Sequence, residues 1–138
     1  MRTINQVVTD NIWRRVKQIT SQSERKTAAI AYVSTHKYVS FRDGDILVCD
    51  ASDQAIESGE TSAAVLAHFF KAGAKIYPCR GLHAKTLIIG RVAIIGSCNL
   101  SESSAEILRE LAVFSMDASI RSQALAFVYG LAKQSQPL

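Results

Sequence analysis

The most informative part of the chain is the stretch GLHAKTLIIGRVAIIGSCNLSESSAEILRE, residues 81–110. It contains two apolar runs, residues 84–89 and 92–95, which are separated only by Gly90-Arg91. A two-residue connection that includes glycine fits a tight β-hairpin. Both runs are continuously apolar, as is typical of strands that are covered on both faces. The stretch therefore predicts two adjacent antiparallel strands within a buried sheet.

The rest of the chain alternates between strand-like and helix-like patterns. Helices are predicted over residues 4–20, 61–72 and 119–133, the first because Ile4, Val8, Ile12, Val16 and Ile19 recur at helical spacing. The last is predicted to bury a stripe of Ile120, Ala124, Phe127, Val128 and Leu131. Strands are predicted over residues 27–34, 45–49, 74–77 and 109–115, with polar connections over residues 36–45, 50–60 and 100–107. This order predicts an α/β fold with a mixed, largely buried β-sheet flanked by helices.

The composition is that of an ordinary globular domain. The chain has 138 residues, 48% of them apolar and 20% charged, so we expect a single domain over residues 1–138 and exclude a disordered or collagen-like chain. The net charge of +4 favours a polyanionic partner. Three cysteines are too few for the disulfide framework of a secreted protein, and an odd number cannot all pair within one chain. Without a signal-peptide pattern or an apolar run that could span a membrane, we expect a cytoplasmic protein that does not bind membranes.

Polar side chains in the stretch 81–110 form a candidate catalytic set. His83 and Lys85 are two residues apart and share one face of a strand, and Ser97 and Asn99 share a face after the next strand. A hairpin brings these two pairs together, and Glu110 follows at the start of a later strand. An imidazole can act as a nucleophile or as an acid and base, while a cation and hydrogen-bond donors stabilise charge on phosphate oxygens. This set suits phosphoryl chemistry.

The order His83-x-Lys85, Gly96-Ser97-x-Asn99 and Glu110 resembles the HxK…GSxN signature of the phospholipase D superfamily, the HKD phosphodiesterases. The resemblance covers the second half of the chain. The superfamily's motif has an aspartate at the position of Gly90, in the hairpin turn, where its role is read as structural. Glycine makes the same turn, so the departure weakens the recognition more than the chemistry, although a degenerate site stays possible.

The resemblance implies a mechanism and a partner. Members of the superfamily use two HxK motifs, and short members with one motif form homodimers with the active site on the two-fold axis. One His83 would attack phosphorus to form a phosphohistidine, while the second would protonate the leaving oxygen and then activate water. Lys85, Ser97 and Asn99 would hold the phosphate oxygens, and Glu110 would orient a His83. No metal and no cofactor is expected.

Simpler interpretations exist for each of these residues. His83 could be a structural or surface histidine, Ser97 and Asn99 could be turn residues, and Glu110 could pair with Arg109. Lys85 within an apolar run is unusual unless it is paired or faces a cleft. The remaining alternatives concern the cysteines: Cys49, Cys79, His83 and Cys98 could be read as zinc ligands, although their spacing is unlike that of structural zinc. Cys98 could be a nucleophile, although it faces away from Ser97 and Asn99, which favours a small buried residue.

The substrate suggested by the resemblance is nucleic acid. Small single-motif members are mostly nucleases, so we expect a metal-independent phosphodiesterase or endonuclease that acts on DNA more readily than RNA. So small a domain leaves little surface for reading bases, so specificity would come from another domain or subunit. The alternatives are a lipid phosphodiesterase of phospholipase D type and a catalytically degenerate module that only binds nucleic acid. Strand type, sequence preference and the completeness of the chain are open at this point.

Overall fold

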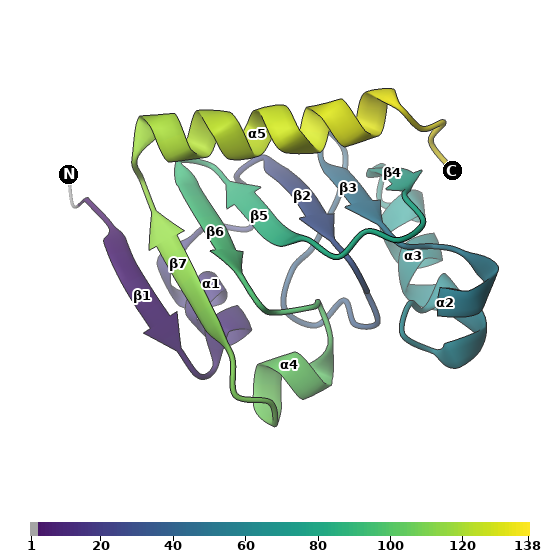
Figure 1. Cartoon of the computed structure of the whole chain (residues 1–138), viewed down its shortest axis with the longest axis horizontal. Coiled ribbons are helices and arrows are strands. Elements are labelled where there is room, and N and C mark those ends of the chain that lie inside the picture. Colours follow the sequence, from purple (N-terminus) through teal and green to yellow (C-terminus); the bar gives the residue numbers. More distant parts are fainter. Residues whose placement is uncertain (1–2) are drawn as a thin grey trace.

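The protein is described by a computed structural model that covers residues 3–138 and forms one seven-stranded sheet in the order β1-β7-β6-β5-β2-β3-β4 (Figure 1). The strands are β1 Asn5–Thr9, β2 Lys26–Ile30, β3 Ile46–Cys49, β4 Lys75–Pro78, β5 Lys85–Ile89, β6 Val92–Gly96 and β7 Leu111–Ser115. The helices are α1 Ile12–Ile19, α2 Asp53–Ser58, α3 Ala63–Lys71, α4 Glu102–Glu106 and α5 Ala118–Lys133.

The sheet combines a parallel half and an antiparallel half. Strands β2, β3 and β4 run parallel, whereas β5, β6, β7 and β1 pair antiparallel. Every residue of β2 is buried, as expected for a strand covered on both faces, whereas β7 alternates between exposed and buried positions. The predicted hairpin is present, because β5 and β6 pair through Gly90-Arg91. The mixed, helix-flanked sheet predicted from the sequence is thus confirmed.

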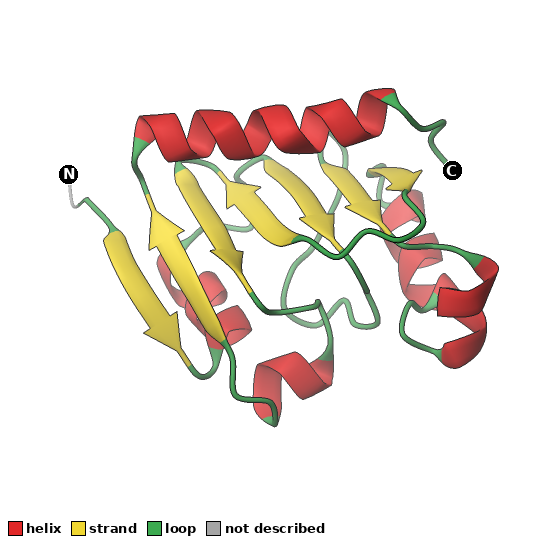
Figure 2. Cartoon of the chain, viewed as in Figure 1, coloured by secondary structure: helices red, strands yellow, loops and turns green. Residues whose placement is uncertain are grey.

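Helices cover the two faces of the sheet unequally. On one face, α1 and α3 bury Ile12, Trp13, Val16 and Phe69 in the larger hydrophobic cluster. On the other face, α5 packs mainly against β2, β3, β5 and β6, and its buried residues join a smaller cluster with Ala29 and Val48. Figure 2 shows α5 crossing the sheet near the ends where β2, β3 and β6 begin, so the opposite edge of the sheet is left to loops and short helices.

The helix predicted over residues 4–20 is wrong in its first half. Residues 5–9 form strand β1, which pairs antiparallel with β7 at the edge of the sheet. Asp10 and Asn11 then adopt left-handed backbone angles, φ 61° and 51°, which no continuous α-helix could include. The spacing Ile4–Val8–Ile12 misled because residues four apart share a face of a strand as well as a face of a helix.

Helix α2 lies in the segment predicted to be a polar loop. Its ends carry ordinary signals: the Ser52 side chain accepts a hydrogen bond from the backbone N–H of Ala55, and Gly59 ends the helix with φ 81°. Ala55 is the only residue buried along this six-residue helix. So short a helix has too few apolar positions to show a helical period, which is why the pattern missed it.

The buried stripe of α5 also differs from the prediction. Ala124, Val128 and Ala132 are buried, whereas Ile120 and Phe127 are 38% and 47% exposed. The helix therefore packs on the sheet through small residues and turns two large apolar side chains outward. Among the residues that the structure describes, no helix combines the length and apolar character needed to cross a membrane.

Candidate active site

The predicted site residues gather at the edge of the sheet that α5 leaves open. His83 directly precedes β5, Lys85 is its first residue, and β6 ends at Gly96. The pairing of Thr86 with Ile95 places Lys85 next to Gly96 across the hairpin. Ser97 and Asn99 follow β6, and Glu110 precedes β7, at the lower edge of the sheet in Figure 2. The hairpin therefore brings the two motif segments together as predicted, although His83 lies just outside the strand.

His83 faces solvent beside a cavity of about 490 Å³. The residues that line this cavity come from the segment around the start of β5, including His83 and Lys85, from the end of β6 and from α5, whose contribution is mostly apolar. The His83 imidazole makes no hydrogen bond or ion pair with any residue in the range 3–138, and the Lys85 ammonium donates to the His83 carbonyl oxygen at 2.8 Å. Neither group is buried within the chain, so both can reach a ligand at the cavity.

Gly96 is required by the close approach of β7. A Cβ atom at this position would lie 2.3 Å from the carbonyl oxygen of Leu111 and 2.7 Å from the Cα of Ala112. Only glycine lets the two strands approach this closely. The glycine of the GSxN segment thus has a structural cause, and it holds the following residues against the start of β7.

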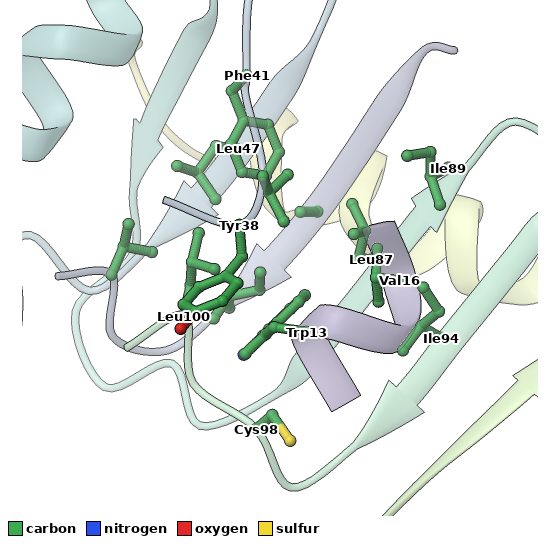
Figure 3. Close-up of a cluster of buried hydrophobic side chains, with 14 of the residues drawn as sticks. Trp13, Val16, Tyr38, Phe41, Leu47, Leu87, Ile89, Ile94, Cys98 and Leu100 are labelled. Atoms are coloured by element: carbon green, nitrogen blue, oxygen red, sulfur yellow. The ribbon is translucent and has the colours of Figure 1, made fainter. Parts of the chain in front are cut away.

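Asn99 is fixed on both its side chain and its backbone. Its side-chain oxygen accepts a hydrogen bond from the Tyr32 backbone N–H at 3.2 Å. Its carbonyl oxygen accepts one from the Trp13 indole N–H at 2.8 Å, and Figure 3 shows Trp13 packed in the core beside Leu100 and Val16. Because the amide oxygen faces a donor, the amide N–H groups are left for another acceptor. This orientation suits a group that donates to a phosphate oxygen.

Ser97 and Glu110 are tied to the same corner of the molecule. The Ser97 hydroxyl accepts a hydrogen bond from the Leu111 N–H at 3.2 Å. The Glu110 carboxylate accepts one from the Ser104 hydroxyl at 3.0 Å and also lies beside the Cys98 thiol. Glu110 makes no hydrogen bond to His83 within residues 3–138. Within one chain, therefore, the structure brings Glu110 to the site but not into contact with the imidazole.

Two of the three cysteines, Cys49 and Cys98, are buried thiols. Burial, together with the hydrogen-bonded Glu110 carboxylate, raises the pKa of Cys98 far above its usual range, so its thiol is protonated at neutral pH. Burial also raises the pKa of Cys49 to about 12. Across residues 3–138 no three His, Cys, Asp or Glu side chains cluster as metal ligands. The geometry gives the zinc and thiolate alternatives no support.

Gly90 lies at the far end of the hairpin from His83. It adopts φ 56° in the two-residue turn, a left-handed conformation that glycine accepts readily. Gly90 is five residues beyond Lys85, the first residue of β5, which at ~3.3 Å per residue separates the turn from the site by about 16 Å. The departure from the superfamily's aspartate therefore does not touch the candidate site.

Two residues that help to build the site were not predicted. Trp13 anchors the Asn99 backbone from α1, and Asp50, directly after β3, accepts a hydrogen bond from the Gly81 N–H in the segment that carries His83. No sequence pattern marked Trp13 as part of the site, because its role depends on how α1 packs against the loop after β6. Asp50 gave a weak signal as a charged residue that directly follows a buried strand.

The sequence and the fold both match known proteins. A family model described as cardiolipin synthase, PLD-like domain, matches residues 14–127, which is most of the chain. The chain belongs to the phospholipase D superfamily. No match is found among curated protein sequences. Membership in the phospholipase D superfamily assigns the chain to the phosphodiesterase hydrolases.

Solved structures share the fold of this phospholipase D superfamily member. Nuc from Salmonella typhimurium, a phospholipase D family member, aligns with a TM-score of 0.73 and 12% identity, over 97% of this chain and 98% of Nuc. NucT from Helicobacter pylori aligns with a TM-score of 0.72 and 14% identity, over 99% of this chain and all of NucT. The archaeal chromatin protein TrmBL2 aligns with a TM-score of 0.62 and 7% identity, over 98% of this chain and 54% of TrmBL2.

Proposed function

We propose that this chain is a metal-independent nuclease that hydrolyses phosphodiester bonds, with DNA as the preferred substrate, and that it acts as a homodimer. The observation that carries the proposal is the joint placement of His83, Lys85 and Asn99 at one edge of the sheet. His83 is exposed beside a cavity, and Asn99 is held so that its N–H groups are available. Superfamily membership supports phosphodiester chemistry at these residues.

The proposed reaction has two steps. The His83 imidazole of one subunit attacks phosphorus, and the bond to the leaving oxygen breaks as His83 of the partner subunit gives that oxygen a proton. The partner subunit's His83 then takes a proton from water, which attacks the phosphohistidine and releases the first imidazole. Lys85, Ser97 and Asn99 bind the phosphate oxygens, and a Glu110 orients a His83. The sequence contains one His-x-Lys motif, and in this proposal the second histidine comes from another copy of the chain.

An exposed apolar surface next to the cavity supports the dimer. Val7 pairs with Val113 and Val113 with Ile95, so these three side chains share the face of the sheet on which α5 packs. Helix α5 does not extend over this row, and each of the three is more than a third exposed. We call this surface the open apolar face; it consists of Val7, Ile95, Leu111, Val113, Ile120 and Phe127.

The open apolar face is continuous with the candidate site. Ile95, Ile120 and Phe127 line the same cavity as His83 and Lys85. Exposed apolar patches rimmed by polar residues are characteristic of protein–protein contacts. A second copy that covered this face about a two-fold axis would be placed directly beside His83.

Positive charge supports a nucleic-acid substrate. The chain carries a net charge of +4, and exposed bases occur near the site, including Arg80 before His83 and Arg109 before Glu110. Lysine and arginine side chains bind the phosphate backbone without regard to sequence. These bases would therefore hold the strand while the two His83 side chains act on one phosphate.

Cleavage by the His83→Ala variant is the direct test. We expect wild type to nick plasmid DNA in the presence of EDTA and the variant to lose at least ~10³-fold in rate, since the nucleophile is removed. Cleavage by the variant at the wild-type rate would overturn the assignment. A wild type that binds DNA with a steep salt dependence but never cleaves it would instead identify a binding module.

Mixed subunits test whether both histidines are needed. Wild type and His83→Ala subunits are unfolded together, refolded in equal amounts and assayed. If each site needs two His83 side chains, about a quarter of the activity remains, whereas about half remains if each chain acts alone. The second result would contradict the shared site.

A lipid substrate is the second candidate. Two observations favour it: the name of the matching family model and the apolar wall of the cavity beside His83. Release of headgroup from phosphatidylcholine or phosphatidylglycerol vesicles, without cleavage of DNA, would support this candidate over the nuclease.

A further inference from the structure

His83 lies in a short segment, residues 79–84, that connects the end of β4 to the start of β5 at Lys85. We call this segment the His83 loop. Its first residue is held by a hydrogen bond from the Cys79 N–H to the Cys49 carbonyl oxygen at 2.8 Å, and its last by one from the Ala31 N–H to the Ala84 carbonyl oxygen at 2.9 Å. Between these ends, the Gly81 N–H donates to the Asp50 carboxylate at 3.2 Å. Two side chains therefore hold the middle of the loop: Leu82, which is buried in the smaller hydrophobic cluster, and Asp50, which is the only one of the two that does so through a hydrogen bond.

Asp50 is itself held firmly. Its N–H donates to the Ala31 carbonyl oxygen at 2.8 Å, and its carbonyl oxygen accepts from the Thr61 hydroxyl at 2.7 Å. Its second carboxylate oxygen accepts from the Ser52 N–H at 3.0 Å, at the start of α2. Asp50 and Thr61 are both buried. The carboxylate therefore connects a rigid strand end to the His83 loop.

The carboxylate of Asp50 is charged at neutral pH. Burial acts to raise its pKa, but hydrogen bonds from the Ser52 and Gly81 N–H groups and the nearby Arg80 guanidinium outweigh burial and lower it. Hydrogen bonds to an ionised acceptor are about twice as strong as those between neutral groups. The bond to Gly81 therefore has a charged acceptor, although its length of 3.2 Å is at the upper end of the range for N–H···O bonds.

We propose that Asp50 is a positioning residue for His83, which sets the place of the imidazole through its hydrogen bond to Gly81. The proposal rests on the catalytic role of His83 proposed above. A nucleophile must lie within a few tenths of an ångström of its productive position, and a shift of about 1 Å can cost about 10²-fold in rate. Asp50 does not touch the substrate.

The Asp50→Asn and Asp50→Ala variants test the proposal in the full-length chain. Asparagine keeps an acceptor for Gly81 without the charge, whereas alanine removes it. We expect kcat to fall by about 5-fold for Asp50→Asn and by about 50-fold for Asp50→Ala, with KM changed by less than about 2-fold, because substrate contacts are intact. Hydrogen exchange at the Gly81 amide should speed up in the same order.

Asp45 offers a matched control at the other end of β3. It is also buried, and its carboxylate accepts hydrogen bonds from the Lys26 and Arg42 N–H groups and forms a buried ion pair with the Lys26 ammonium at 3.2 Å, so its loss should cost more stability than that of Asp50. We expect Asp45→Asn to lower the melting temperature at least as much as Asp50→Asn while it leaves kcat and Gly81 exchange unchanged. If Asp45→Asn does not fold, Asp117→Asn serves in its place, since Asp117 accepts from the Ile120 N–H in the α5 cap.

A second variant in the His83 loop keeps the proposal testable. Gly81 has φ 80°, and an added Cβ there would meet no atom within 4 Å, so Gly81→Ala strains the turn without a clash. If Asp50 acts through Gly81, the losses in kcat from Asp50→Asn and Gly81→Ala will not multiply in the double variant. Independent, multiplicative losses would overturn the proposal.

The result can be separated from that of the proposed function. Unchanged kcat and unchanged Gly81 exchange in Asp50→Ala would overturn the positioning role while His83→Ala still abolished cleavage. If wild type cleaves no phosphodiester, the proposed function fails instead. The positioning role of Asp50 is then tested by hydrogen exchange at the Gly81 amide and by the NMR signals of the His83 imidazole. Changes in both of these signals in Asp50→Ala, but not in Asp45→Asn, would support the positioning role.

Discussion

Gly96 is the residue at which the motif and the fold depend most directly on each other. It is part of the GSxN segment, and its missing side chain is what allows β6 and β7 to approach each other. The same contact places Ser97 against Leu111, next to Glu110. The glycine of the GSxN segment is thus explained by strand packing.

We expect Gly96→Ala to destabilise the protein by about 2–3 kcal/mol, because its Cβ must push against the backbone of β7. Urea unfolding measures this loss. Gly130→Ala is the matched control: Gly130 lies within α5, and an added Cβ there would meet no atom within 4 Å. That change should stabilise the protein by about 0.5–1 kcal/mol. Equal stability of Gly96→Ala and wild type would contradict the packing argument.

The residue types of the candidate site were predictable residue by residue, but their hydrogen-bond partners were not. His83, Lys85, Ser97 and Asn99 stood out because polar side chains interrupt apolar runs. The hydrogen bonds from Tyr32 to Asn99 and from Gly81 to Asp50 join segments that are 67 and 31 residues apart. Contacts across such separations leave no periodic pattern in a sequence.

At the scale of elements, the β5–β6 hairpin separates Gly90, which replaces the superfamily's aspartate, from the candidate site. The hairpin turn and the site lie at opposite ends of β5. A Cβ at Gly90 would lie 3.0 Å from the carboxylate of Glu24, which is at the end of a flexible side chain. The turn therefore has room for a side chain once Glu24 moves.

We expect Gly90→Asp, which restores the superfamily's residue, to leave kcat within about 2-fold of wild type, because the turn does not contact the site. Stability should fall by about 0.5–1 kcal/mol, from the left-handed backbone and the nearby like charge of Glu24. Gly90→Asn, which lacks the charge, should lose less. The assay is DNA cleavage together with thermal unfolding, and a large gain in activity for Gly90→Asp would show that the turn acts on the site.

Elements with a long apolar run or with clear capping and turn residues at their ends were predicted well, and elements that lack these features were not. The buried strands β3, β5 and β6 and the capped helix α3 match their predictions closely, whereas β2 ends at Ile30, four residues before the predicted end at residue 34. The prediction for residues 5–9 was wrong because an apolar spacing of four residues fits both a strand and a helix. Only the pairing with β7 makes this segment the strand β1. Helix α2 was not predicted because it is shorter than two full helical turns and so shows no helical period.

At the scale of the whole molecule, the open apolar face and the site form one continuous surface. Helix α5 packs against the central strands of the sheet (Figure 1). Its buried residues are Ala124, Val128 and Ala132, whereas Ile120 and Phe127 are partly exposed and line the cavity together with Ile95 of β6. Exposing these side chains is unfavourable in water by roughly 25 cal/mol per Å². A second copy would remove much of this cost and supply the second His83 at the same time.

We expect Val7→Asp and Phe127→Asp to reduce the mass in solution from dimer to monomer, and to lower activity with it, since charges do not tolerate burial in an apolar contact. Light scattering after gel filtration measures the mass. Val7 does not line the cavity with His83, so its effect on activity would act through association alone. Phe70→Asp is the control, because Phe70 is an exposed aromatic residue, 57% against 47% for Phe127, on α3, which packs against the opposite face of the sheet. A wild type that is strictly monomeric and active would contradict the shared site.

By itself, the sequence was enough to establish the fold class, the β5–β6 hairpin and the residue types of the site, because apolar runs and interrupting polar residues are local signals. Only the tertiary structure decided that residues 5–9 join β7 and that Asp50 holds the His83 loop. It also decided that Ile120 and Phe127 face outward beside the cavity. Those outcomes depend on which strands pair and which helix face packs, and such choices are made by contacts between residues distant in the chain.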